Sequence, residues 1–190
     1  MRRWCVLAIV TLGCALVPLA GWEAPVPGRL LDAADACRVR PHAFYIEAAA
    51  TLPRGQARAV LRLAEHAIQE WPAGEAASVA VDGPAGGMER VTLAAACPPD
   101  AAQARAIERR MRMLLGPDAR ISTCLTGRTS GEDLDATAER ALRALDDFPQ
   151  QALREAKLVS LTGERAQVAL RADEGGAMVF LACPLMPMDY

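Results

Sequence analysis

Four arginines are the residues in this sequence whose type and spacing could bind a ligand. Arg105, Arg109 and Arg112 recur at intervals of four and three, so a helix over residues 100–115 would carry them along one face. A row of guanidinium groups could bind the anionic groups of a cell-wall polymer, a lipid headgroup or a DNA phosphate. The same row is typical of the solvated outer face of an amphipathic helix, and we favour that interpretation. Arg171 lies on a predicted strand, where it would contribute to the open side of a sheet.

Cysteines are the second group with chemical potential. Four of the six cysteines lie outside the apolar N-terminal segment. In an oxidising compartment they could form two disulfides, with three pairings open, and they fit equally well as small buried residues with free thiols. No C-x-x-C spacing occurs, which argues against a zinc site and against thioredoxin-type chemistry. The four are Cys37, Cys97, Cys124 and Cys183.

The other polar residues give no catalytic pattern. His42 and His66 have no second ligand at metal spacing, and no serine stands in a G-x-S-x-G setting. Asp146 and Asp147 are neighbours on a predicted helix and do not form a converging carboxylate pair. We therefore expect no metal, no cofactor and no catalytic residue, and hence not an enzyme.

The N-terminal segment indicates export. Arg2-Arg3 precedes an uncharged stretch from Trp4 to Trp22, which is typical of a secretory leader. At about 19 residues this stretch is also long enough to span a bilayer, so a cleaved signal peptide and a retained membrane anchor both stay open. We expect residues 1–24 to be this segment and residues 25–28 to be a linker. The protein would then be secreted or anchored to the outer face of the cytoplasmic membrane.

Apolar periodicity and turn residues predict an alternation of helices and strands. Thr51 would cap one helix, with Pro53 in its first turn, and Ser130 would cap another. Residues 149–157 would link the last helix to a β-meander that ends the chain. The helices are expected over 30–37, 51–71, 100–115 and 134–148, and the strands over 43–48, 78–81, 90–96, 119–126, 158–162, 166–171 and 178–183.

The order helix, strand, helix, strands occurs twice. Both long helices end with an aromatic residue and Pro, at Trp71-Pro72 and Phe148-Pro149, and both sheets end with Ala-Cys-Pro. We therefore predict a duplication, with a first αβ repeat over 29–98 and a second over 99–190 in one pseudo-twofold domain. The fold class would be α+β, with amphipathic helices backing one face of a curved antiparallel sheet.

The C-terminal part of the chain, over roughly residues 120–190, resembles the YwmB-type family of exported bacterial proteins. The residues that carry this resemblance are Val159-Ser160, Val168-Ala169-Leu170-Arg171, Pro184-Leu185-Met186 and Asp189-Tyr190. The resemblance implies an N-terminal export segment and a TATA-box-binding-protein-like fold, a duplicated saddle of sheet backed by helices. It supplies no catalytic residue, because the family has no established biochemical role.

These observations predict a non-enzymatic extracytoplasmic envelope protein of YwmB type that binds a protein or glycan partner on its sheet face. The alternative is a DNA-binding protein of TATA-box-binding type. A net charge of −2 lacks the basic excess that nucleic-acid binders have, and export also argues against DNA. The N-terminal segment would contact the membrane if it is not cleaved. The side chains offered to a partner would include Ser122, Thr123, Thr126, Gln167 and Arg171, with Phe44, Tyr45 and Phe180 as the few aromatics.

Overall fold

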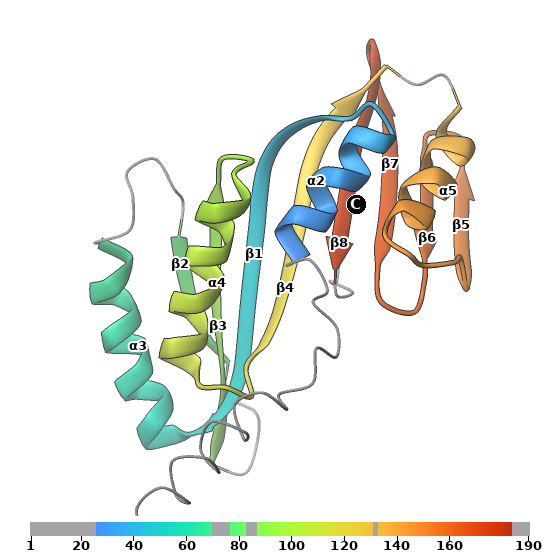
Figure 1. Ribbon diagram of the computed structural model, residues 1–190. Helices are drawn as coiled ribbons and strands as arrows, with labels where there is room; N and C mark the ends of the chain where they lie inside the picture. Colours follow the sequence, from blue (N-terminus) through green and yellow to red (C-terminus); the bar gives the residue numbers. More distant parts are fainter. Residues whose placement is uncertain (1–25, 70–76, 83–86, 131–132, 184–190) are drawn as a thin grey trace, which may run out of the picture.

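The structure is a computed structural model that describes residues 26–69, 77–82, 87–130 and 133–183. In these residues, four helices lie on one face of a single eight-stranded antiparallel sheet, which confirms the α+β class (Figure 1). The predicted leader or anchor over residues 1–24 lies outside the described residues. Within the described ranges, no helix has both the length and the apolar character that crossing a bilayer requires.

All strand pairs in the sheet are antiparallel. The strand order is β2-β3-β1-β4-β8-β7-β6-β5, so β1 and β4 are adjacent near the middle although α3, β2, β3 and α4 separate them in sequence. The strands are β1 (Arg40–Pro53), β2 (Ala77–Asp82), β3 (Met88–Cys97), β4 (Arg120–Thr129), β5 (Gln151–Glu155), β6 (Leu158–Thr162), β7 (Gln167–Asp173) and β8 (Gly176–Cys183).

The helices form one layer that follows the order of the strands beneath it. α3 contacts β2 and β3, α4 contacts β1 and β3, α2 contacts β4, β1 and β8, and α5 contacts β6 and β7. Each helix also contacts the next one in the order α3, α4, α2, α5, which places all four on the same face (Figure 1). The helices are α2 (Val26–Ala36), α3 (Arg54–Gln69), α4 (Ala101–Leu115) and α5 (Leu134–Ala144).

The core lies between the helix layer and the sheet. Along β1, Phe44, Ile46 and Ala48 are buried and alternate with more exposed residues, as expected for a strand with one covered face. The apolar stripes predicted for the helices over 100–115 and 134–148 are confirmed by the buried residues of α4 and α5, but α5 ends at Ala144 and not at Phe148. Burial of apolar surface against a sheet is what stabilises helices of this length, which are marginal alone.

β1 is longer than the sequence predicts. We expected a strand over 43–48 followed by a helix with Thr51 as its cap and Pro53 in its first turn. Both residues instead belong to β1, where Thr51 pairs with Arg90 of β3. The prediction was wrong because β3 offers a partner along this whole segment, and pairing across the sheet outweighs a local capping pattern.

Three further boundaries differ from the predictions. Residues 25–28 are not only a linker, since α2 begins at Val26 and Pro27 fits the first turn of a helix. The cap of α5 is Asp133, whose carboxylate accepts a backbone hydrogen bond in the first turn, and not Ser130. Residues 149–157 contain β5, whose side chains are all exposed, so no apolar pattern marked it as a strand.

Candidate functional site

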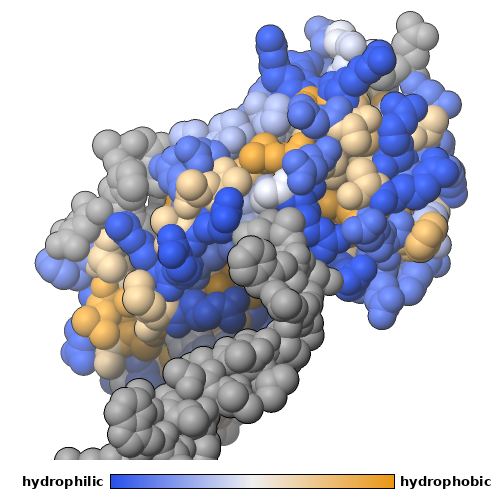
Figure 2. Space-filling model, viewed as in Figure 1, coloured by the Kyte–Doolittle hydropathy of each residue, from blue (hydrophilic) through white to orange (hydrophobic). Residues whose placement is uncertain are grey.

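Arg105, Arg109 and Arg112, the three arginines of α4 singled out above, lie on the helix layer, and two of them donate to nearby backbone carbonyls. The Arg105 Nε donates to the Ala101 carbonyl at 3.0 Å, and an Arg112 terminal nitrogen donates to the Pro117 carbonyl at 3.3 Å. Arg109 and Arg112 are exposed. Figure 2, which views this face, shows hydrophilic residues over α4, with apolar side chains gathered near α3. This arrangement fits the interpretation of a solvated outer face.

A carboxylate shares the surface hollow beside these arginines. The hollow measures about 380 Å³ and is lined by Ala102, Arg105, Glu108 and Arg109. The Thr123 hydroxyl of β4, whose residue is 1% exposed, donates to Glu108 Oε1 at 2.5 Å. Burial raises the pKa of Glu108, although the Thr123 hydroxyl and the charges of Arg112 and Arg105 oppose that rise. The carboxylate reduces the positive charge that an anion would meet in this hollow.

Replacing Glu108 with Gln is expected to raise the melting temperature at pH 7. Because its folded pKa lies above its unfolded pKa, the stability that comes from protonating Glu108 is present at low pH and is lost as pH rises through the folded pKa. Gln stays neutral and its amide oxygen can still accept from Thr123. Thermal unfolding followed by circular dichroism at pH 4 and pH 7 measures the difference, which should be small at pH 4. The exposed Glu65, changed to Gln, is the control, and a lower melting temperature for Glu108→Gln at pH 7 would contradict this account.

Arg171 lies on the other face of the sheet. Val168 and Leu170 of β7 are buried in the core, so Arg171, which is exposed, projects from the face away from the helices. The four arginines singled out in the sequence therefore do not form one site. Three belong to the helix layer and one to the opposite face of the sheet, with the sheet between them.

The face of the sheet away from the helices, called the open face below because no described helix lies on it, collects the side chains that alternate with the core residues. It is not exposed throughout, since Cys124, Thr126, Ala169 and Ala182 on this face are at most 8% exposed. Its centre carries Tyr45, which is 49% exposed. Tyr45 pairs with Cys124, and Cys124 pairs on its other side with Ala182. These small neighbours leave the phenol ring exposed. The residues of the open face include Tyr45, Glu47, Ala49 and Thr51 of β1, Arg90, Thr92, Ala94 and Ala96 of β3, Ser122, Cys124 and Thr126 of β4, Met178, Phe180 and Ala182 of β8, and Gln167, Ala169 and Arg171 of β7.

Two residues that we expected on this face lie on the other. Phe44 is fully buried in the core, and Thr123 faces Glu108 of α4. Conversely, Arg90 and Arg120 were not singled out from the sequence, and both lie on the open face. Their placement on this face depends on the order of the strands in the sheet, and no local sequence pattern indicates that order.

All four cysteines outside the N-terminal segment are free thiols in the structure, so the two-disulfide arrangement is not found. Cys124 pairs with Ala182, and Cys183 follows Ala182 in β8, so their side chains project from opposite faces. Cys37 and Cys97 pack in the core between sheet and helices, the side opposite Cys124. A bond from Cys124 to any of the other three would therefore have to cross the sheet.

The buried thiols are poor nucleophiles at neutral pH. Burial raises the pKa of Cys124 to about 12, although a hydrogen bond with the Leu181 backbone acts to lower it. Burial also raises the pKa of Cys37, whose thiol donates to the Thr137 carbonyl at 3.9 Å, while the charge of Arg140 opposes the rise. Because the thiolate is the reactive form, neither thiol is prepared for nucleophilic chemistry.

The described parts of the chain contain no group of three His, Cys, Asp or Glu side chains that could hold a metal ion. His42 is exposed in β1 and His66 is exposed in α3. They lie on different elements, and neither belongs to such a group among the described residues. Asp146 is exposed, whereas Asp147 is buried and accepts hydrogen bonds from backbone N–H groups, so these two carboxylates do not act as a pair.

No known family model matches this sequence, and no curated protein matches it. Among solved structures, the chain is similar to the de novo designed protein Foldit4, at 9% identity and a TM-score of 0.33, over 44% of this chain and 93% of that chain. It is also similar to a Bacillus cereus protein related to NIF3, at 13% identity and a TM-score of 0.26, over 68% of this chain and 44% of that chain. Likenesses of this size give no argument about fold or function.

Proposed function

We propose that this chain is a non-enzymatic extracytoplasmic envelope protein of YwmB type that binds a protein or glycan partner on its open face. The observation that carries the proposal is the half-exposed Tyr45 at the centre of a sheet face that no described helix covers. An aromatic ring among small residues can stack on a sugar ring or fill a pocket of a protein partner. Phe180, which pairs with Thr126 and Ala169, adds a second, partly buried ring to the same face.

We further propose that the sheet is a duplicated saddle of TATA-box-binding-protein type. The support is the strand order, in which β1 and β4 are neighbours, β3 and β8 flank them, and β2 and β7 come next. Each of β1 and β4 follows one helix and precedes another. The β5–β6 hairpin would be the extra part of the second repeat.

The register gives independent support for a pseudo-dyad. Cys97 ends β3 opposite Phe44, and Cys183 ends β8 opposite Thr123. Phe44 and Thr123 each stand one residue before the members of the Tyr45–Cys124 pair, which join β1 to β4. An axis through that pair would therefore exchange the Ala-Cys ends of β3 and β8.

The test is a photo-activated cross-linker placed at Tyr45 in the full chain, in intact cells. A matched variant carries the cross-linker at Leu63, which is 61% exposed on α3 in the helix layer. We expect a discrete adduct from position 45 and none from position 63, because only the open face would meet the partner. Mass spectrometry and glycosidase treatment then assign the adduct to protein or glycan.

Four outcomes would contradict the proposal. Equal adducts from both positions, or none from position 45, would remove the open face as the binding surface. Fractionation of the same cells that finds the protein only in the cytosol would remove the compartment. Tight DNA binding that collapses steeply as salt rises, measured by electrophoretic shift, would favour the DNA-binding alternative instead.

A further inference from the structure

β1 continues past the start of β4 and leaves a notch at one end of the open face. β4 begins at Arg120, which pairs with Ala49, whereas β1 runs on and pairs with β3 as far as Pro53. Beyond Ala49, no described strand therefore pairs with β1 on its β4 side. The notch is a hollow of about 390 Å³ lined by Ala49, Ala50, Thr51, Arg90, Asp118 and Arg120.

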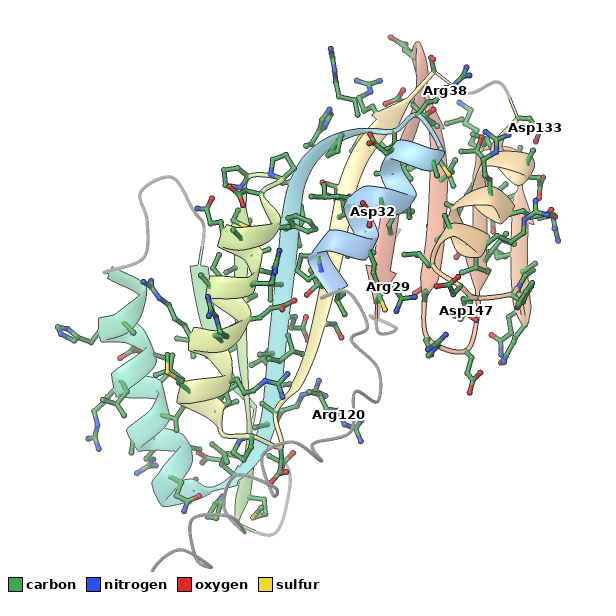
Figure 3. The ribbon with its side chains drawn as sticks, viewed as in Figure 1. Arg29, Asp32, Arg38, Arg120, Asp133 and Asp147 are labelled. Carbon is green, nitrogen blue, oxygen red and sulfur yellow. The ribbon has the colours of Figure 1, made fainter. Side chains whose placement is uncertain are left out.

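Two guanidinium groups reach this notch from opposite sides of β1. Arg90 of β3 pairs with Thr51, and Arg120 of β4 pairs with Ala49, so both arginines flank one short piece of β1. Figure 3 shows Arg120 at the end of the sheet far from Arg38 and Asp133. Across the described residues, no hydrogen bond or ion pair involves Arg90 or Arg120. Both are exposed, and no described residue takes up their guanidinium donors.

The β1 segment that lines the notch supplies neutral hydrogen-bond donors and has only small side chains. Ala49 and Ala50 are small, and Thr51 supplies a hydroxyl. Successive residues of an antiparallel strand direct their N–H and C=O groups to alternate sides, so part of this segment's backbone faces the notch rather than a strand. Asp118 is the one acidic lining residue, and no ion pair joins it to either arginine in the part of the chain described.

We propose that this notch is a binding site for an oxyanion, a phosphate or carboxylate group, held between Arg90 and Arg120. A guanidinium fork matches the geometry of such groups, and two forks from neighbouring strands would contact different oxygens. The oxyanion could be a free ion or a group on an anionic polymer lying along the open face. In the second case the inference rests on the proposed function, because the partner would supply the anion.

The test measures binding to the full chain by calorimetry, with inorganic phosphate, polyphosphate and hyaluronan as probes. Arg90→Gln and Arg120→Gln are each expected to weaken binding roughly tenfold, because each removes charge-assisted hydrogen bonds. Asp118→Asn should strengthen binding several-fold by removing a like charge beside the anion. Arg62→Gln, an exposed arginine of α3, makes the same change of charge on the helix layer and should leave the affinity within twofold. Circular dichroism establishes that each variant is folded.

The probes separate the sources of the anion. Similar affinity per phosphate for the free ion and the polymer assigns the site to free anions, and a clear preference for either polymer assigns it to an anionic polymer. Either result supports the site. No binding of any probe, or an equal loss in Arg62→Gln and Arg90→Gln, would overturn it. If phosphate binds here while the cross-linker at position 45 captures nothing, the proposed function fails and the oxyanion site stands.

Discussion

Replacing Asp147 with Ala is expected to lower the free energy of unfolding by at least about 3 kcal/mol. The carboxylate accepts four backbone hydrogen bonds, from Phe148 at 2.9 Å, Glu164 at 3.1 Å, Arg165 at 2.7 Å and Ala166 at 2.8 Å. Asp147 is only 6% exposed, so water cannot readily replace these contacts. Urea unfolding measures the loss as a shift of the midpoint at constant slope.

The position of this carboxylate explains the size of the effect. Asp147 follows the end of α5, and three of the four N–H groups that donate to it come from the turn between β6 and β7 (Figure 3). Gly163 opens that turn, and a Cβ added there would overlap the Asp147 carboxylate. The hydrogen bonds of this carboxylate thus connect the segment after α5 to the turn between β6 and β7, and so hold the helix layer against this part of the sheet.

The effect of Asp147→Ala should depend on pH with a definite sign. Desolvation alone raises the pKa of the Asp147 carboxyl, but the four N–H donors outweigh it and hold the pKa below its ordinary value of 3.8. A lowered folded pKa gives stability that is present above the unfolded pKa and is lost as pH falls through the folded pKa. The difference between the variant and the natural protein should be complete at pH 7 and should shrink only below pH 3.8.

Asp146→Ala is the matched control. Asp146 is the preceding residue, and its ion pair with Arg29 at 3.6 Å involves a carboxylate side chain that is 84% exposed. The Arg29 side chain is only 17% exposed, but the solvated carboxylate gains little from the pair, so this variant should lose less than about 1 kcal/mol. Equal losses for the two variants would mean that general charge, and not the four hydrogen bonds, explains the result.

Elements with a covered apolar side could be predicted from the sequence, and those without one could not. The stripe of α4 and the three apolar runs of the terminal meander are signals spread over many residues, and both are confirmed, the runs as β6, β7 and β8. The end of β1 was misjudged because Thr51 and Pro53 fit a helix start as well as a strand, and only pairing with β3 decides between them. β5 has five exposed residues and is a strand only because β6 lies beside it.

The candidate sites were harder to predict because they depend on residues that are distant in sequence. Arg90 and Arg120 line the same notch only because β1 lies between β3 and β4 in the sheet. Asp147 accepts hydrogen bonds from residues 17 to 19 positions later, through backbone N–H groups that leave no mark on residue type. The α4 arginines were easier to notice because helical spacing is local, yet two of them contact their own helix or the turn after it.

Replacing Gly176 with Ala is expected to lower the free energy of unfolding by about 3 kcal/mol. Gly176 has φ of 151°, and a Cβ added there would overlap the Thr129 carbonyl of β4. Because the obstacle is backbone at the point where β8 begins to pair with β4, no side-chain rotation can relieve it. The comparison variant is Gly175→Ala, since Gly175 has φ of 90° but nothing within 4 Å of its added Cβ.

The two glycine variants distinguish the penalty of a positive φ from the steric overlap of the added Cβ. Gly175→Ala should cost only the conformational penalty of about 1 kcal/mol, whereas Gly176→Ala adds the overlap with Thr129. Urea unfolding measures the loss in free energy of unfolding for both variants. Equal losses would show that the backbone of β4 shifts away from the added Cβ at no measurable cost. A larger loss at Gly176 would instead mean that β8 is held tightly against β4. That contact fixes Phe180, opposite Thr126, at a set distance from Tyr45 on the open face, as a preorganised binding surface requires.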